Sequence, residues 1–269
     1  MTDVVLRRFC EQCQAYREPH EIKQVGPERV RLSACAICGG VLRTEQQRIA
    51  RPLTASLLRA YAYPALPAIA VSTVVAALTS AFAAYVPLIG GLLSATIVIA
   101  FVFLVLRASA EGRDDLAIDT EVAERLSEWF APLIRYLLTW LVSFSGALVA
   151  LFVLGPPAGP LVAFGLGLVG LLYLPAGLIV AAHGDGCLSP INPVPAVRII
   201  GRIPGPYAVA LGFLLLTSLV GFGLLAIVQR LIGGIALVGP LVLRVLGLAT
   251  LVVMARQLGV LVHEHREEL

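Results

Sequence analysis

Residues 64–106 read PALPAIAVSTVVAALTSAFAAYVPLIGGLLSATIVIAFVFLVL and contain no charged side chain. Pro87 divides this stretch into two apolar runs of about 20 residues, the length that an α-helix needs to cross about 30 Å of hydrocarbon. We therefore expect a membrane-spanning hairpin, with spans over about 64–86 and 88–106. Once the hairpin is inserted, all residues before Pro64 must lie on one side of the membrane.

The composition of the whole chain is that of a membrane protein. Of the 269 residues, 58% are hydrophobic and 14% are charged, whereas a soluble domain has about 25% charged residues. Residues 1–63 hold ten of the twenty Lys and Arg side chains and six of the seventeen acidic ones. This asymmetry predicts a small polar head on a membrane body with several spans. The net charge of +3 is too small to indicate nucleic acid as a partner.

Four further apolar segments complete a predicted all-α domain of six transmembrane helices over 64–262. They cover about 134–154, 161–182, 207–229 and 241–262. The segment Leu231–Gly239 is too short and too rich in glycine to cross alone, so we interpret it as a connection or a re-entrant turn. Residues 1–48 contain no apolar run of the kind that a signal peptide needs, so the first span is expected to be an uncleaved anchor.

The arginines predict how the spans are oriented. If the N-terminus is cytoplasmic, eighteen of the twenty Lys and Arg residues fall on the cytoplasmic side, and only Arg230 and Arg244 fall outside. The positive-inside rule therefore places both termini in the cytoplasm, including the short tail 263–269.

Four cysteines form two C-x-x-C pairs in the N-terminal head: Cys10, Cys13, Cys35 and Cys38. Paired thiolates at this spacing are typical of a four-cysteine Zn²⁺ site. A segment as short as 1–42 cannot build an adequate apolar core, so the metal would supply most of its folding free energy. Four cysteines leave no coordination position open, and the predicted zinc is therefore structural. The alternative of two disulfides is disfavoured by the predicted reducing compartment.

The segment around these cysteines resembles a zinc ribbon over about 6–42, with a small β domain as the implied fold. Residues 43–63 then mix arginines with apolar side chains at helical spacing, which predicts an amphipathic connector in the lipid headgroup layer. An ordinary linker helix is the alternative. Similar amphipathic segments are expected at 119–130 and 192–203, each ahead of a pair of spans, so that the body consists of three repeated units.

The predicted spans contain little ionisable chemistry. None holds an Asp, Glu, His or Lys residue, which argues against an ion-coupled transporter. Near the span ends lie three arginines that we interpret as anchors reaching to the interface: Arg135, Arg244 and Arg256. After the fourth span, His183, Asp185 and Cys187 could form a metal site or a nucleophile pair. Because glycines separate them, we favour a simple membrane-exit turn.

The region 174–269 resembles a family of uncharacterised bacterial inner-membrane proteins with about six spans. The resemblance rests on the segments Leu174–Ala176, Leu188–Pro193, Ile199–Tyr207 and Leu258–His263. It implies a multi-pass fold and a location in the bacterial inner membrane. It implies no activity, because none is established for that family.

Together these features predict a non-enzymatic interaction, assembly or regulatory module embedded in the lipid bilayer. The zinc ribbon is expected to dock a cytoplasmic protein partner. Glycines in the fourth and fifth spans allow close helix approach and are compatible with a homo-oligomer. One alternative is a permease for a neutral or lipidic substrate, and a further one is a membrane enzyme that uses the loop 183–206.

Overall fold

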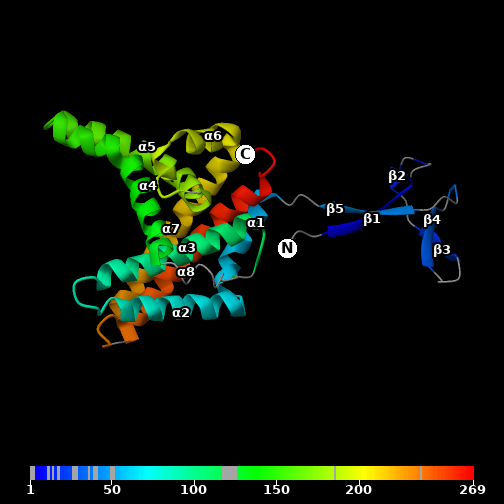
Figure 1. Ribbon diagram of the computed structural model, residues 1–269, viewed down its shortest axis with the longest axis horizontal. Helices are drawn as coiled ribbons and strands as arrows, with labels where there is room; N and C mark the ends of the chain where they lie inside the picture. Colours follow the sequence, from blue (N-terminus) through cyan, green and yellow to red (C-terminus); the bar gives the residue numbers. More distant parts are fainter. Residues whose placement is uncertain are drawn as a thin grey trace. The chain divides into compact units, whose positions relative to one another are not determined.

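The computed structural model of the chain consists of two compact units, Met1–Pro52 and Leu53–Leu269 (Figure 1). It describes residues 4–10, 13, 15–16, 19–25, 30–35, 37–38, 42–48, 52–114, 116, 126–184, 186–236 and 238–269.

The N-terminal unit is built from short antiparallel strands. Its first sheet has the order β2 (Ala15–Tyr16), β1 (Val4–Cys10) and β5 (Leu42–Arg48). Its second sheet pairs β3 (Pro19–Val25) with β4 (Val30–Cys35). The first cysteine of each C-x-x-C pair therefore ends a strand, since Cys10 closes β1 and Cys35 closes β4.

The structure differs from the predicted connector over 43–63. Strand β5 pairs with β1 along its whole length, from Cys10 opposite Leu42 to Val4 opposite Arg48, so it belongs to the N-terminal unit. Helix begins only at α1 (Leu53–Arg59), after Pro52, and a proline is favoured where a helix starts. The β pairing partner lies more than thirty residues away in the sequence, and local helical spacing carries no information about such a partner.

The second unit has the predicted all-α fold, with apolar helices that are long enough to span a membrane. Its long helices are α2 (Pro67–Ala83), α3 (Gly90–Ala110), α4 (Leu126–Val153), α5 (Ala158–His183), α7 (Pro204–Ile232) and α8 (Val238–Glu264). Within the described residues, all of these except α2 are long and apolar enough to cross a membrane. Helix α2 has 17 residues, or about 25 Å, which is short for one span.

The first predicted span is broken in the structure. Helix α1 continues into the 3-10 helix η1 (Ala60–Ala65), and together they meet α2 at an angle of 63°. If this bent pair counts as one span, the described chain has six spans. The bend lies between Pro64 and Pro67, where two proline rings each remove a backbone N–H donor.

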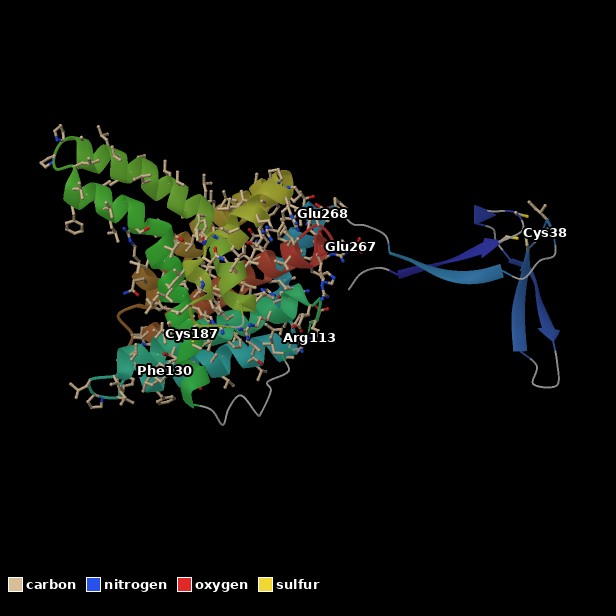
Figure 2. All side chains as sticks on the ribbon, turned by 45° about the horizontal axis from the view of Figure 1, so that its top comes forward. Cys38, Arg113, Phe130, Cys187, Glu267 and Glu268 are labelled. Atoms are coloured by element: carbon tan, nitrogen blue, oxygen red, sulfur yellow. The ribbon has the colours of Figure 1, made fainter. Side chains whose placement is uncertain are left out.

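The helices pack around a core that α3, α5, α7 and α8 share with α1, η1, α2 and α6 (Val194–Arg202) (Figure 1). Fully buried side chains of this core include Ile69 on α2, Leu106 on α3 and Leu261 on α8. Helix α4 packs mainly against α5, and the turn that joins them projects away from the other helices of this unit (Figures 1 and 2). Apolar side chains on this projecting hairpin are exposed, as expected of a lipid-facing surface.

Two of the short predicted segments are visible between the long helices. The segment predicted at 192–203 forms the amphipathic helix α6 (Val194–Arg202). The segment Leu231–Gly239 is a short connection, since α7 ends at Ile232 and α8 begins at Val238. The prediction for 119–130 falls largely outside the described residues.

Candidate metal centre and buried polar groups

The four predicted ligands come together at the ends of β1 and β4. Their Sγ atoms all lie within 4.8 Å of one another. The Cys10 and Cys38 sulfurs are 3.3 Å apart, and those of Cys13 and Cys35 are 3.9 Å apart. Figure 2 shows sulfur atoms gathered beside Cys38. Each close contact joins one C-x-x-C pair to the other, so the two turns face each other.

This spacing fits one metal ion held by four thiolates. With metal–sulfur bonds of about 2.3 Å, the corners of a tetrahedron lie about 3.8 Å apart. The measured separations lie on either side of that value. None of the five cysteines of the chain forms a disulfide. Among the described residues, this is the only group of three or more His, Cys, Asp or Glu side chains close enough to share a metal ion.

Backbone donors make the second C-x-x-C turn suitable for a thiolate. The backbone N–H groups of Cys38 and Ile37 donate to the sulfur of Cys35 and lower the pKa of Cys35 to about 6. The pKa of Cys13 is raised to about 12, first by its hydrogen bond with the Cys38 side chain and then by burial. Backbone hydrogen bonds thus stabilise the thiolate form of Cys35 within the cluster.

The structure describes only part of the predicted cluster after the fourth span. The Nδ1 atom of His183 lies 3.0 Å from the carbonyl oxygen of Ile179, one helical turn earlier. Cys187 is exposed, and Asp185 lies outside the described residues. Within the described chain, His183 and Cys187 belong to no group that could hold a metal ion.

Arg135 was predicted to reach the interface, and the structure buries it instead. Its side chain is only 9% exposed. Its Nη1 donates to the carbonyl oxygen of Ala181 at 3.5 Å, and Nε of Arg107 donates to the next carbonyl, that of Ala182. Both acceptors belong to the last turn of α5, whose carbonyls have no partner within the helix and favour positive charge. Two arginines from α3 and α4 therefore cap α5.

The other two predicted anchors also have partners inside the protein. Arg256 forms an ion pair of 2.6 Å with Asp114, and its guanidinium lies 4.5 Å from the ring centre of Tyr63. Arg244 donates to the hydroxyl of Ser94 at 3.2 Å. These contacts join α8 to the N-terminal part of α3 and to the segment just after α3, so the two arginines stabilise the packing of α8 against its neighbours.

A network of polar side chains, buried on α7 and α8, connects η1, α7 and α8. The Gln257 side chain is fully buried, and its Nε2 donates to the Thr217 hydroxyl at 3.0 Å. The Thr217 hydroxyl donates to the carbonyl of Phe213, so its lone pairs accept from Gln257 and from the Tyr61 hydroxyl at 2.8 Å. These polar side chains are all neutral, so looking for ionisable residues in the predicted spans does not find this network. The available signal was a neutral amide, Gln257, inside an apolar segment that was predicted to span the membrane.

No protein-family model, curated protein or solved structure matches this chain. The predicted resemblance to a bacterial inner-membrane family stays a prediction.

Proposed function

We propose that this protein is a multi-pass protein of the bacterial inner membrane whose N-terminal zinc ribbon docks a cytoplasmic protein. The observation that carries the proposal is the cluster of four cysteine sulfurs at the ends of β1 and β4. The cluster belongs to a unit of its own, joined to a helical unit that is suited to a bilayer.

Zinc is the metal that suits the cluster best. Four thiolates in a tetrahedron are typical of zinc or of iron–sulfur sites. A cluster of several irons would hold the cysteine sulfurs farther apart than one ion does, because its irons lie between them. The sulfur separations of 3.3 and 3.9 Å therefore favour a single ion.

The proposed role follows from the closed donor set. All four corners of the tetrahedron are protein thiolates, so substrate could bind the metal only by displacing a ligand. Such a site shapes and stabilises the surface around it and does not catalyse a reaction. A folded surface of this kind, tethered to a membrane, is suited to binding another protein and bringing it to the bilayer.

A cytoplasmic location of both termini is part of the proposal. Within the helical unit, hydrogen bonds bring the C-terminal ends of α3, α5 and α8 together: Arg107 to Ala182, His263 to Ala110 and Arg256 to Asp114. Arg107, Arg256 and Asp114, which are all assigned to the cytoplasmic side, thus lie at the same end of this unit, as the positive-inside rule predicts.

We expect a reporter enzyme that is active only in the periplasm to stay silent when fused after Leu269. The same reporter fused in the turn at Pro157, between α4 and α5, should be active. The reason is that three apolar helices, α5, α7 and α8, lie between that turn and the tail. Each crossing changes sides, so three crossings place the turn and the tail on opposite sides of the membrane. Activity of the Leu269 fusion would overturn the orientation.

The docking role is tested by affinity capture of the full-length protein from crosslinked native membranes. Wild type is compared with Cys35→Ser at equal membrane abundance. The matched control is Cys187→Ser, which changes the one cysteine outside the cluster. We expect a cytoplasmic protein to be recovered with wild type and control, and its recovery to fall at least about tenfold with Cys35→Ser because the ribbon unfolds. Equal recovery with wild type, Cys35→Ser and Cys187→Ser would overturn the docking role and favour a permease.

A further inference from the structure

A cleft of about 340 Å³ opens between the C-terminal ends of α5 and α8 and the short helix α6. Its wall is apolar, and the side chains that form most of it are Ile179, Val180, Ile199 and Val262. Two basic side chains, His183 and Arg198, also line it, together with Gly184, Pro195 and Leu269, and no acidic side chain takes part. The cleft therefore combines positive charge with a hydrocarbon surface.

Arg198 is available to a ligand. It is exposed, and it forms no hydrogen bond or ion pair within the described part of the chain. Arg202, one turn further along α6, is different: its Nη1 donates to the backbone oxygens of Glu268 and Leu269, at 3.1 and 2.6 Å. Helix α6 thus uses one arginine to hold the C-terminal segment and leaves the other beside the cleft.

His183 is the second basic group of the cleft. Its Nδ1 faces the carbonyl of Ile179, which can only accept a hydrogen bond, so Nδ1 carries a proton. Nε2 is then left for a ligand, and it becomes a second donor when the ring is protonated.

The surroundings place this cleft at the level of lipid headgroups. It lies where α5 and α8 end, and hence at one end of two helices that are long enough to cross the bilayer. Val194 and Val197 on α6 are more than half exposed, while Ala196 and Ile203 on its other side are buried. A short amphipathic helix with such an exposed apolar face lies in the membrane interface.

We propose that the cleft binds an anionic glycerophospholipid. Arg198 donates to its phosphate diester, His183 lies beside the headgroup, and the first carbons of one acyl chain lie on the apolar wall of Ile179, Ile199 and Val262. Charge complementarity selects this occupant, because the cleft offers the positive charge of Arg198, no acidic side chain and a hydrocarbon surface next to the bilayer. The inference rests on the membrane location of the helical unit and does not depend on the docking role of the ribbon.

The test measures lipid binding to the purified full-length protein by native mass spectrometry. The protein in detergent is stripped of lipid and titrated with phosphatidylglycerol or with phosphatidylcholine. Wild type should bind one phosphatidylglycerol more tightly than any phosphatidylcholine. Arg198→Gln should weaken that first binding step at least about tenfold, the effect of losing one charged hydrogen bond. Arg230 is an exposed arginine at the far end of α7, and the control substitution Arg230→Gln should leave the first lipid-binding step unchanged.

Two further measurements distinguish a lipid site from a site for a free anion. Ile199→Asn keeps both basic groups but makes the wall polar, so it should weaken phosphatidylglycerol binding as well. Inorganic phosphate should fail to displace the lipid at equal concentration. Equal affinities of Arg198→Gln, Arg230→Gln and wild type would overturn the site. Displacement by inorganic phosphate, with no effect of Ile199→Asn, would show a free-anion site and overturn the lipid assignment.

Discussion

The purified full-length protein is expected to hold about one zinc ion per chain, and Cys13→Ser is expected to lose it. The four sulfurs lie within 4.8 Å of one another, so removing one leaves an incomplete tetrahedron. Structural zinc sites of this type contribute about 10–16 kcal/mol of apparent binding free energy, which is also folding free energy. Losing one thiolate should therefore lower the zinc affinity by several orders of magnitude and unfold the N-terminal unit.

The measurement is elemental analysis of the protein by mass spectrometry, normalised to protein concentration. Cys187→Ser is the matched control, because this exposed cysteine lies outside the cluster. Wild type and control should carry equal zinc, and Cys13→Ser little. Iron in place of zinc would refute the metal assignment. Full zinc occupancy in Cys13→Ser would refute the ligand set.

Replacing Gly259 with valine is expected to destabilise the helical unit strongly. Here α8 crosses α3 so closely that a Cβ atom would overlap the Cβ of Ser109 and lie 2.8 Å from the carbonyl oxygen of Leu106. The second of these atoms is backbone, so α3 and α8 would have to move apart. Overpacking costs about 1–3 kcal/mol when side chains can adjust, and we expect at least about 3 kcal/mol here.

Thermal unfolding in detergent checks this prediction. Gly247→Val is the control: it places the same side chain in the same helix, where no atom lies within 4 Å of the new Cβ. Both variants carry the same intrinsic cost of a β-branched residue in a helix. Only Gly259→Val should lower the melting temperature strongly. Equal shifts in the two variants would show that helix propensity, and not the contact of α3 with α8, accounts for the change.

The membrane-spanning helices could be predicted from the sequence because hydropathy is a local property. About 20 apolar residues in a row predict a span whatever lies beside them, and the long helices of the structure cover the predicted ranges. The first span shows the limit of this reasoning. The sequence is apolar without interruption from Pro64 onward. In the structure, however, a new helix begins at Pro67, and it is bent by 63° from the helix that α1 and η1 form.

The candidate metal centre was equally accessible to sequence reasoning. Each C-x-x-C pair is a local turn, and two such turns with the right spacing have few other uses. The boundary of the N-terminal unit was not accessible. Its last strand, β5, follows the cysteines and pairs with β1 at the other end of the unit, and residues 42–48 carry no strong strand pattern of their own.

The sequence by itself thus determined that the protein has a cysteine-rich polar head and a body of apolar helices. Both conclusions depend on residues that are near neighbours along the chain. Only the tertiary structure decided that Arg135 caps α5, that Gln257 is bonded across to α7, and that α5, α6 and α8 enclose a basic cleft. Each of these features joins side chains from different helices, and their proximity is set by how the helices pack, which hydropathy and spacing along one helix do not encode.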